Sequence, residues 1–154
     1  MTDRYAVVGH PIAHSKSPLI HAAFATATGQ DIAYTAIEAP LDGFEATVRA
    51  FFEGGGRGLN VTLPFKLQAC EMATDPSEAA RLAGAANALK IDGDRIWAEN
   101  FDGVGLVNDI QRNLGHAIAG KRVLLLGAGG ATRGAILPIA AQGPAVLAVA
   151  NRTA

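Results

Sequence analysis

Residues that could hold and react with a small polyhydroxylated molecule gather after apolar segments in residues 1–102. Two of them, Lys66 in LNVTLPFK and Asp102 in ENFDG, offer the cation and carboxylate that suit proton transfer. The others are hydroxyls and carboxamides, which can each locate a hydroxyl group and reject an analogue that lacks it. They are Ser15, Ser17, Asn60, Thr62, Asn87 and Asn100.

Several of these side chains also have an ordinary structural interpretation. Small polar residues favour turns and helix N-caps, and lysines are usually solvated. The structural alternatives are a turn for Ser15, a helix N-cap for Ser17, turns or caps for Asn60 and Asn87, a solvated side chain for Lys66, and an N-cap alone for Asp102. The residues by themselves leave both interpretations open.

A glycine-rich turn in VLLLGAGGATRGAI, residues 123–136, is the most readable motif. An apolar strand pattern leads into the glycines and then into a helix pattern, the context in which such a turn binds a dinucleotide pyrophosphate. The match to G-x-G-x-x-G is imperfect because Thr132 stands at the third glycine position. The alternative is a plain glycine-rich turn. The residues expected to hold the pyrophosphate are Gly127, Ala128, Gly129, Gly130 and Ala131.

The end of the next apolar segment indicates which dinucleotide is bound. NAD enzymes commonly place Asp or Glu there to bind the ribose 2′-hydroxyl, but this segment ends in Asn151-Arg152-Thr153. A guanidinium can pair bidentately with a 2′-phosphate, so Arg152 favours NADP(H). Arg152 can also be a solvated surface charge, and Arg133 can be a second phosphate contact or an exposed helical residue.

Alternating strand and helix patterns must position these residues. Strands are predicted at 4–9, 32–38, 58–63, 88–91, 95–98, 121–126 and 145–150. Helices are predicted after Ser17-Pro18 up to Gly29, after an Asp42 N-cap up to Gly54, after Pro64 through Met72, and at 77–83, 102–114 and 131–141. Asp92-Gly93 predicts a type I′ hairpin turn. The alternation is typical of βαβ units and a largely parallel sheet.

The helix at 102–114 looks like a hinge between two units, the first of which is residues 1–101. The second unit contains one strand–helix–strand, which cannot cover both faces of a sheet. We therefore expect further chain, or another chain, to complete it.

Composition excludes several classes of protein. The 154 residues are 49% hydrophobic and 18% charged, which is typical of a soluble globular protein, and a net charge of −1 gives no electrostatic reason to expect nucleic acid or an anionic membrane as partner. Cys70 is the only cysteine, so an internal disulfide is impossible and a cytoplasmic location is favoured. No signal peptide or membrane span is recognisable. The histidines lack metal-ligand spacing, so no metal site is predicted.

The motifs SKSP, NVTLPFK, GAANAL, NFDGVG, GAGGATRG and NRT, in this order and across the whole chain, resemble the shikimate dehydrogenase family. The resemblance implies an α/β fold in which residues 1–101 form a three-layer α/β/α substrate domain with a mainly parallel sheet. Residues 102–154 would form a linker helix and the first βαβ of an incomplete Rossmann-type NADP-binding domain. The implied reaction is the NADP-dependent interconversion of 3-dehydroshikimate and shikimate, in chorismate and aromatic amino-acid biosynthesis.

The resemblance also implies roles for individual residues. Lys66 and Asp102 would form the catalytic pair. The implied substrate-binding residues are Ser15 and Ser17 for the carboxylate, with Asn60, Thr62, Asn87 and Asp102 for ring hydroxyls, and Lys66 would also contact the substrate. The implied cofactor-binding residues are Gly127 to Gly134 for the pyrophosphate, with Asn151, Arg152 and Thr153 for the 2′-phosphate.

The sequence differs from the family pattern in two respects. Phe101 stands where the family pattern Asn-Thr-Asp-Gly has threonine, and family chains continue further, with a later helix that packs back on the first domain. The alternatives are a quinate/shikimate dehydrogenase that prefers NAD, a non-catalytic shikimate-binding module, and a bare nucleotide-binding fragment. A monomer or a homodimer is expected, and the 154-residue chain alone is expected to be poorly active.

Overall fold

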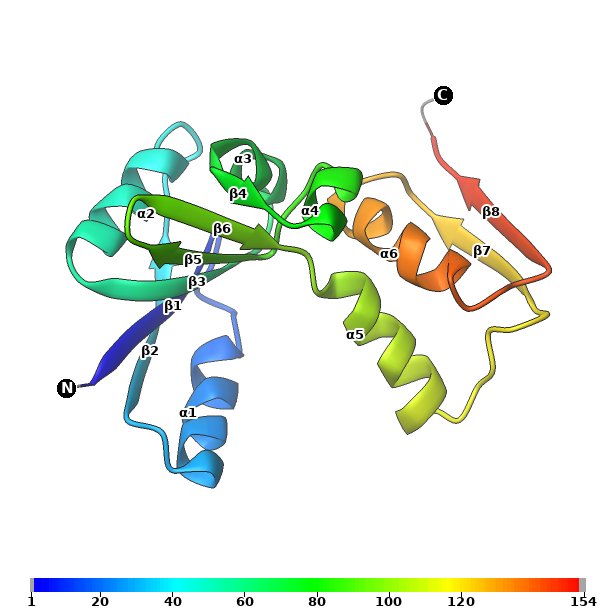
Figure 1. The fold of residues 1–154 in the computed structure, drawn as a ribbon, viewed down its shortest axis with the longest axis horizontal. Helices are drawn as coiled ribbons and strands as arrows, with labels where there is room; N and C mark the ends of the chain where they lie inside the picture. Colours follow the sequence, from blue (N-terminus) through cyan, green and yellow to red (C-terminus); the bar gives the residue numbers. More distant parts are fainter. Residues whose placement is uncertain (1, 153–154) are drawn as a thin grey trace.

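The computed structural model describes residues 2–152, which form a six-stranded sheet and a separate two-stranded parallel sheet (Figure 1). The six strands, in the order β2-β1-β3-β5-β6-β4, are β1 (Asp3–Gly9), β2 (Ile32–Glu38), β3 (Gly56–Val61), β4 (Asp75–Pro76), β5 (Ala88–Asp92) and β6 (Arg95–Glu99). The second sheet contains β7 (Arg122–Leu126) and β8 (Val146–Ala150). Three of the five neighbouring pairs in the larger sheet are parallel, which confirms the predicted mainly parallel α/β fold.

Six α-helices connect the strands within the described residues. They are α1 (Ser17–Thr28), α2 (Phe44–Glu53), α3 (Lys66–Met72), α4 (Glu78–Ala83), α5 (Asp102–Asn108) and α6 (Gly130–Ala140). The predicted helix at 102–114 is present, but it changes to a π-helical turn, η1 (Asp109–Asn113), after α5. The two-residue strand β4 was not predicted, because it is too short to show a periodic pattern.

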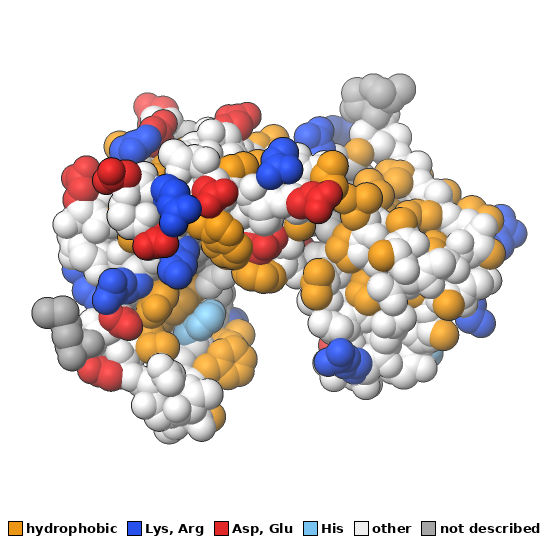
Figure 2. All heavy atoms as spheres, viewed as in Figure 1, with side chains coloured by type: hydrophobic (Ala, Val, Ile, Leu, Met, Phe, Trp, Pro, Cys, Tyr) orange, Lys and Arg blue, Asp and Glu red, His pale blue; other side chains and the backbone are white. Residues whose placement is uncertain are grey.

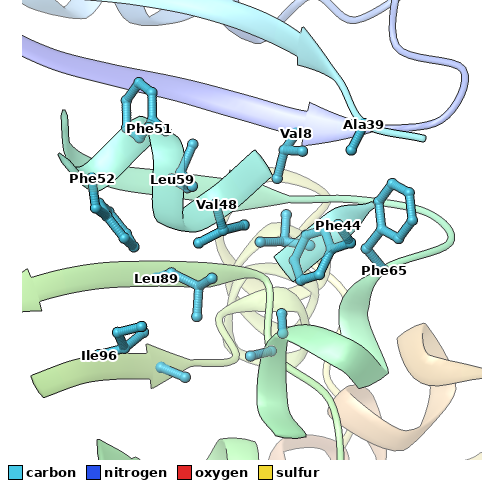
Figure 3. Close-up of a cluster of buried hydrophobic side chains, with 14 of the residues drawn as sticks. Val8, Ala39, Phe44, Val48, Phe51, Phe52, Leu59, Phe65, Leu89 and Ile96 are labelled. Atoms are coloured by element: carbon cyan, nitrogen blue, oxygen red, sulfur yellow. The ribbon is translucent and has the colours of Figure 1, made fainter. Parts of the chain in front are cut away.

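The main core lies between one face of the larger sheet and helices α2 and α3 (Figure 3). Phe44, Val48 and Phe52 recur every four residues along α2, so they share one face of that helix and are buried together. Phe65 stacks on Phe44 with ring centroids 4.8 Å apart. The sheet contributes alternate residues of β1, β3, β5 and β6 to this cluster.

Helix α1 packs on the opposite face of the sheet, over β1 and β2, so the first unit has three layers. His21 of α1 stacks on Tyr34 of β2 with ring centroids 4.0 Å apart. Beyond α1, the same face is open over β3, β5 and β6. Tyr5, Lys90 and Trp97 line a cavity of about 440 Å³ there.

Helix α6 covers one face of the two-stranded sheet. Ala135 and Ile139 of α6 form a small core with Val107 of α5, and side chains from β7 and β8 pack against it. Leu124 and Leu126, on the other face of β7, are 60% and 78% exposed. Figure 2 shows exposed hydrophobic side chains over this part of the molecule. A single strand–helix–strand therefore leaves one sheet face uncovered, as expected.

Two predicted helix caps are wrong. Helix α2 has Gly43 as its N-cap and no side-chain cap bond, so Asp42 does not cap it. Helix α1 has Lys16 as its N-cap, which makes Ser17 the first residue of the helix rather than its cap. No side-chain hydrogen bond caps this helix, and the backbone N–H of Ser17 donates to the Ser15 hydroxyl at 3.3 Å.

The hairpin between β5 and β6 has a different turn from the predicted type I′. Asp92 pairs with Arg95, so the turn residues are Gly93 and Asp94. Gly93 has a φ of +60°, but no described residue other than glycine has a positive φ. A type I′ turn needs positive φ at both turn residues, so that prediction is wrong although the hairpin itself is present.

Helices α5 and α6 approach each other closely at Gly103. A Cβ added there would lie 2.7 Å from the Pro138 Cγ and would also collide with the backbone oxygen of Gly134. A Cβ added at Gly105, two residues along the same helix, would meet nothing within 4 Å. The absence of a side chain at Gly103 is therefore what permits this packing.

Alanine at these two glycines should have opposite effects on stability. We expect Gly103→Ala to lower the free energy of unfolding by about 1–3 kcal/mol through overpacking. We expect Gly105→Ala to raise it by about 0.5–1 kcal/mol, because alanine loses less backbone entropy in a helix. Urea unfolding followed by circular dichroism measures both. Equal changes for the two variants would contradict the close approach of α5 and α6.

Candidate functional site

Lys66 and Asp102 meet although 36 residues separate them. The Lys66 Nζ donates to the Asp102 Oδ2 at 2.5 Å, and the two side chains are only 14% and 28% exposed. Lys66 is therefore not a solvated lysine. Asp102 is the first residue of α5, whose N-cap is Phe101, so its carboxylate is not merely a helix cap. Both structural alternatives are wrong for these residues.

Asn87 completes a three-residue cluster with this ion pair. Its Nδ2 donates to the Asp102 Oδ1 at 2.7 Å, and its Oδ1 accepts from the backbone N–H of Phe101 at 2.9 Å. The backbone of Asn87 bonds to Val61 at the end of β3 and to Glu99 at the end of β6. Both oxygens of Asp102 thus have donors, which fix the orientation of its carboxylate.

The main core sets the position of Lys66. Phe65, the preceding residue, is 1% exposed and lies in the core against Phe44. The backbone oxygen of Lys66 accepts from the N–H of Ala86 at 2.8 Å, which ties the start of α3 to the segment before Asn87. Core packing on one side and this bond on the other hold Lys66 at the edge of the sheet.

Asn100 holds Asp102 in position at the start of α5. Its side chain is buried, with an Oδ1 that accepts from the Asp102 N–H at 3.1 Å and an Nδ2 that donates to the Ala85 oxygen at 2.9 Å. A Cβ added at Gly134 would lie 2.6 Å from the Asn100 carboxamide. Asn100 therefore joins the start of α5, the 85–87 segment and α6, a role that its sequence position did not predict.

A second group of predicted site residues gathers around Tyr34. The Tyr34 hydroxyl donates to the Asn60 Oδ1 at 2.6 Å, and the Ser17 side chain is in hydrogen-bond contact with Tyr34. Ser15 joins through the bond from the Ser17 N–H. Burial raises the pKa of Tyr34, so the phenol stays protonated, while the contact with Ser17 acts in the opposite direction. Tyr34 could not be predicted from the sequence, because nothing in its strand pattern reveals a hydrogen-bond partner.

Thr62 follows the last residue of β3, between Asn60 and the start of α3. Its backbone N–H donates to the Val8 oxygen, and its own oxygen accepts from the Phe65 N–H, both at 3.0 Å. The side chain is half-buried. Thr62 therefore lies on the short link between the group around Tyr34 and Lys66.

The glycine-rich turn lies beside Lys66. Gly127 has a φ of +97°, a conformation that favours glycine. A Cβ added at Gly127 or Gly129 would meet nothing within 4 Å, whereas one at Gly130 would lie 3.8 Å from the Lys66 Cβ. Three residues of the predicted loop, Ala128, Gly129 and Ala131, are exposed.

The end of β8 lies next to this turn, because the Gly127 N–H donates to the Ala150 oxygen at 2.7 Å. Asn151 and Arg152 follow directly and are exposed. Thr153, the third residue predicted to bind the 2′-phosphate, lies outside the described residues. The turn and the end of β8 thus form one edge of the smaller sheet.

The open cavity beside Asn60 and Tyr34 includes neither Lys66 nor Asp102 in its lining. Its position over a bare sheet face, away from the paired charges, makes it a weaker guide to chemistry than the ion pair. In residues 2–152, no three His, Cys, Asp or Glu side chains group as a metal site would require. None of the helices described is long and apolar enough to cross a membrane. Cys70 is partly buried, and its thiol donates to the Ala80 oxygen.

Comparisons with known proteins connect this geometry to a family. A curated relative named shikimate dehydrogenase (NADP(+)), from Janthinobacterium sp. (strain Marseille), is 60% identical over 152 residues, which cover 99% of this chain and 56% of the relative. The chain therefore spans little more than half the length of that relative.

Two solved structures are also similar to this chain in fold and sequence. The Ael1 enzyme from Pseudomonas putida superposes with a TM-score of 0.93 at 59% identity, over 98% of this chain and 56% of that one. Shikimate 5-dehydrogenase from Thermus thermophilus, in complex with shikimate, has a TM-score of 0.89 at 33% identity, over 99% of this chain and 57% of that one.

The family model described as the shikimate dehydrogenase substrate binding domain matches residues 7–89. This segment contains β2, β3, β4 and parts of β1 and β5, together with Lys66 and Asn87. Because the match covers more than half of the chain, and the relatives above share its sequence and fold, the chain belongs to the shikimate dehydrogenase family.

Proposed function

We propose that this chain is the N-terminal portion of an NADP-dependent shikimate dehydrogenase, which interconverts 3-dehydroshikimate and shikimate in chorismate and aromatic amino-acid biosynthesis. The observation that carries the proposal is the shielded contact between Lys66 and Asp102, with Asn87 on the second carboxylate oxygen. A cation and a carboxylate joined in this way can bind one substrate hydroxyl from two sides and exchange a proton with it. The protein is proposed to be cytoplasmic, and a monomer or homodimer.

We propose that substrate binding and cofactor binding belong to the two different sheets. Residues 1–101, with the larger sheet, would bind the substrate, and residues 102–154 would provide the linker helix and the first βαβ of a Rossmann-type NADP-binding domain. Support comes from the bare face of the smaller sheet, which matches the start of a doubly wound domain. Support also comes from Gly130, whose closeness to Lys66 brings the proposed cofactor turn beside the proposed catalytic lysine.

The substrate carboxylate is proposed to bind at Ser15 and Ser17. Ser17 is the first residue of α1, so its hydroxyl lies where the positive end of a helix dipole favours an anion. The ring hydroxyls are proposed to bind four side chains that can recognise hydroxyl groups. These are Asn60, Thr62, Asn87 and Asp102.

The glycine-rich turn fits a dinucleotide pyrophosphate. Gly127 and Gly129 have open space where side chains would stand, and the N-cap of α6 has no side-chain bond that would occupy its first N–H groups. Gly127 to Ala131 would hold the pyrophosphate, and Arg152 with its neighbours Asn151 and Thr153 would hold the 2′-phosphate. Bound there, NADP(H) would donate or accept the hydride.

Lys66 is proposed to handle the proton. During reduction its ammonium group would stabilise negative charge on the carbonyl oxygen and donate a proton to it, and in the reverse direction neutral Lys66 would accept that proton. Asp102 would hold the Lys66 Nζ and the substrate hydroxyl in line, while Asn87 keeps the carboxylate oriented. The segment that carries Lys66 is anchored in the core, so the group is positioned before substrate arrives.

Replacing the proposed acid–base group should affect turnover more than binding. We expect Lys66→Ala in the full-length protein to lower kcat for shikimate oxidation with NADP⁺ by roughly 10²–10⁴-fold, with a much smaller change in the dissociation constant for shikimate. Spectrophotometric rates and calorimetric titration measure the two effects. Lys121→Ala, an exposed lysine before β7, is the control and should keep full activity. An unchanged kcat in Lys66→Ala would exclude the role.

Replacing the proposed phosphate ligand should change cofactor preference. We expect Arg152→Ala to raise the KM for NADPH by roughly 10- to 100-fold and to leave the KM for NADH nearly unchanged, because a charge-assisted bond to phosphate contributes about 1.5–3 kcal/mol. Arg122→Ala, an exposed arginine at the other end of the same small sheet, should change neither value. Equal rises in the KM for NADPH and the KM for NADH would mean that Arg152 does not bind the 2′-phosphate.

A further inference from the structure

The Tyr34–Asn60 hydrogen bond determines which end of the Asn60 carboxamide is free. The Tyr34 hydroxyl is the donor in this 2.6 Å bond, so it engages the Asn60 Oδ1 and leaves the Nδ2 to other partners. An amide oxygen only accepts, whereas the amide nitrogen only donates. Asn60 held in this way presents N–H groups to a ligand, rather than an oxygen.

Tyr34 is itself held from two sides. The His21 ring stacks on it at 4.0 Å with an interplanar angle of 3°, and the Ser17 side chain is in hydrogen-bond contact with it. Burial lowers the pKa of His21, so that ring is neutral at neutral pH and adds no charge beside the phenol. The tyrosine thus connects α1 to β3, and links two residues proposed to touch opposite parts of one substrate.

We infer that Tyr34 is a positioning residue that sets the orientation of the Asn60 carboxamide, so that Asn60 donates to an oxygen of the bound hydroxy-acid. This inference rests on the proposed function, because it concerns how the proposed substrate site recognises its ligand. A carboxamide free to flip can match either a donor or an acceptor, whereas the orientation held by Tyr34 matches only an acceptor. Tyr34 therefore contributes to selectivity without touching the substrate.

Tyr34→Phe tests this directly in the full-length enzyme, because it removes one oxygen and keeps the ring on His21. We expect a rise of about tenfold in both the KM and the dissociation constant for shikimate, the size of one net hydrogen bond. We expect kcat at saturating shikimate to change less than twofold. Tyr5→Phe is the matched control, since Tyr5 pairs with Tyr34 in the β1–β2 register, and it should leave all three constants unchanged.

A double-mutant cycle separates positioning from a merely structural role. If Tyr34 acts through Asn60, then Tyr34→Phe combined with Asn60→Ala should bind shikimate no more weakly than Asn60→Ala alone. Additive losses would overturn the inference, and so would an unchanged KM in Tyr34→Phe. Asn60→Asp gives an independent test, because it retains an acceptor for Tyr34 but has no N–H for the ligand. It should weaken shikimate binding at least as much as Asn60→Ala does, and wild-type affinity in this variant would overturn the inference.

The wild-type enzyme distinguishes the two levels of the account. If wild type neither binds nor oxidises shikimate, the proposed function fails and this inference fails with it. If wild type is active and the Tyr34→Phe constants equal those of wild type, only the inference about Tyr34 fails.

Discussion

The ion pair between Lys66 and Asp102 is the contact on which the rest of the site depends. Removing two charges from water costs free energy that their attraction repays only when the geometry is good and the remaining polar atoms are satisfied. Here the second oxygen of Asp102 accepts from Asn87, and the start of its helix is held by the buried side chain of Asn100. The larger sheet and its core supply this geometry, because Phe65 anchors one partner and β6 leads to the other.

Close contacts near this ion pair fix the position of the two sheets relative to each other. Asn100 touches the 85–87 segment through Ala85 and would collide with any side chain at Gly134 of α6. Gly103 allows α5 to approach α6 in the same region. Glycines at these close contacts therefore bring the glycine-rich turn beside Lys66, which is the arrangement that the proposed reaction requires.

Sequence patterns predicted those parts of the fold that depend on local preferences. The strand at 32–38 has the predicted bounds, and Gly29 ends α1 with the left-handed conformation expected of a C-terminal glycine. Features decided by tertiary contacts were missed or wrong. Strand β4 has only two residues, and the π-helical turn after α5 has no distinct sequence signal.

In the candidate site too, residue types could be predicted from the sequence, whereas tertiary contacts could not. The polar residues at strand ends were recognisable by type, and the meeting of Lys66, Asn87 and Asp102 was expected from a family resemblance rather than from local pattern. Tyr34 was not predicted as a site residue, and Asn100 was listed as a polar candidate without its structural role, because their partners come from other strands or loops and depend on register. Hydrogen-bond partners across a sheet are properties of the folded chain, which a single sequence does not display.

Phe101, the departure from the family pattern, leaves the ion pair intact. Its backbone N–H donates to Asn87, a contact that any residue except proline can make. Phe101 is 53% exposed, and its ring centroid lies 6.4 Å from that of Trp97. The geometry at Asp102 thus depends on the backbone at position 101, which explains how the chain tolerates phenylalanine there.

A crystal structure of the full-length protein with bound shikimate tests the central claim most directly. The account predicts one ring hydroxyl of shikimate within about 2.6–3.2 Å of both the Lys66 Nζ and a carboxylate oxygen of Asp102. Shikimate bound away from these two groups, or bound with no hydroxyl shared between them, would contradict it.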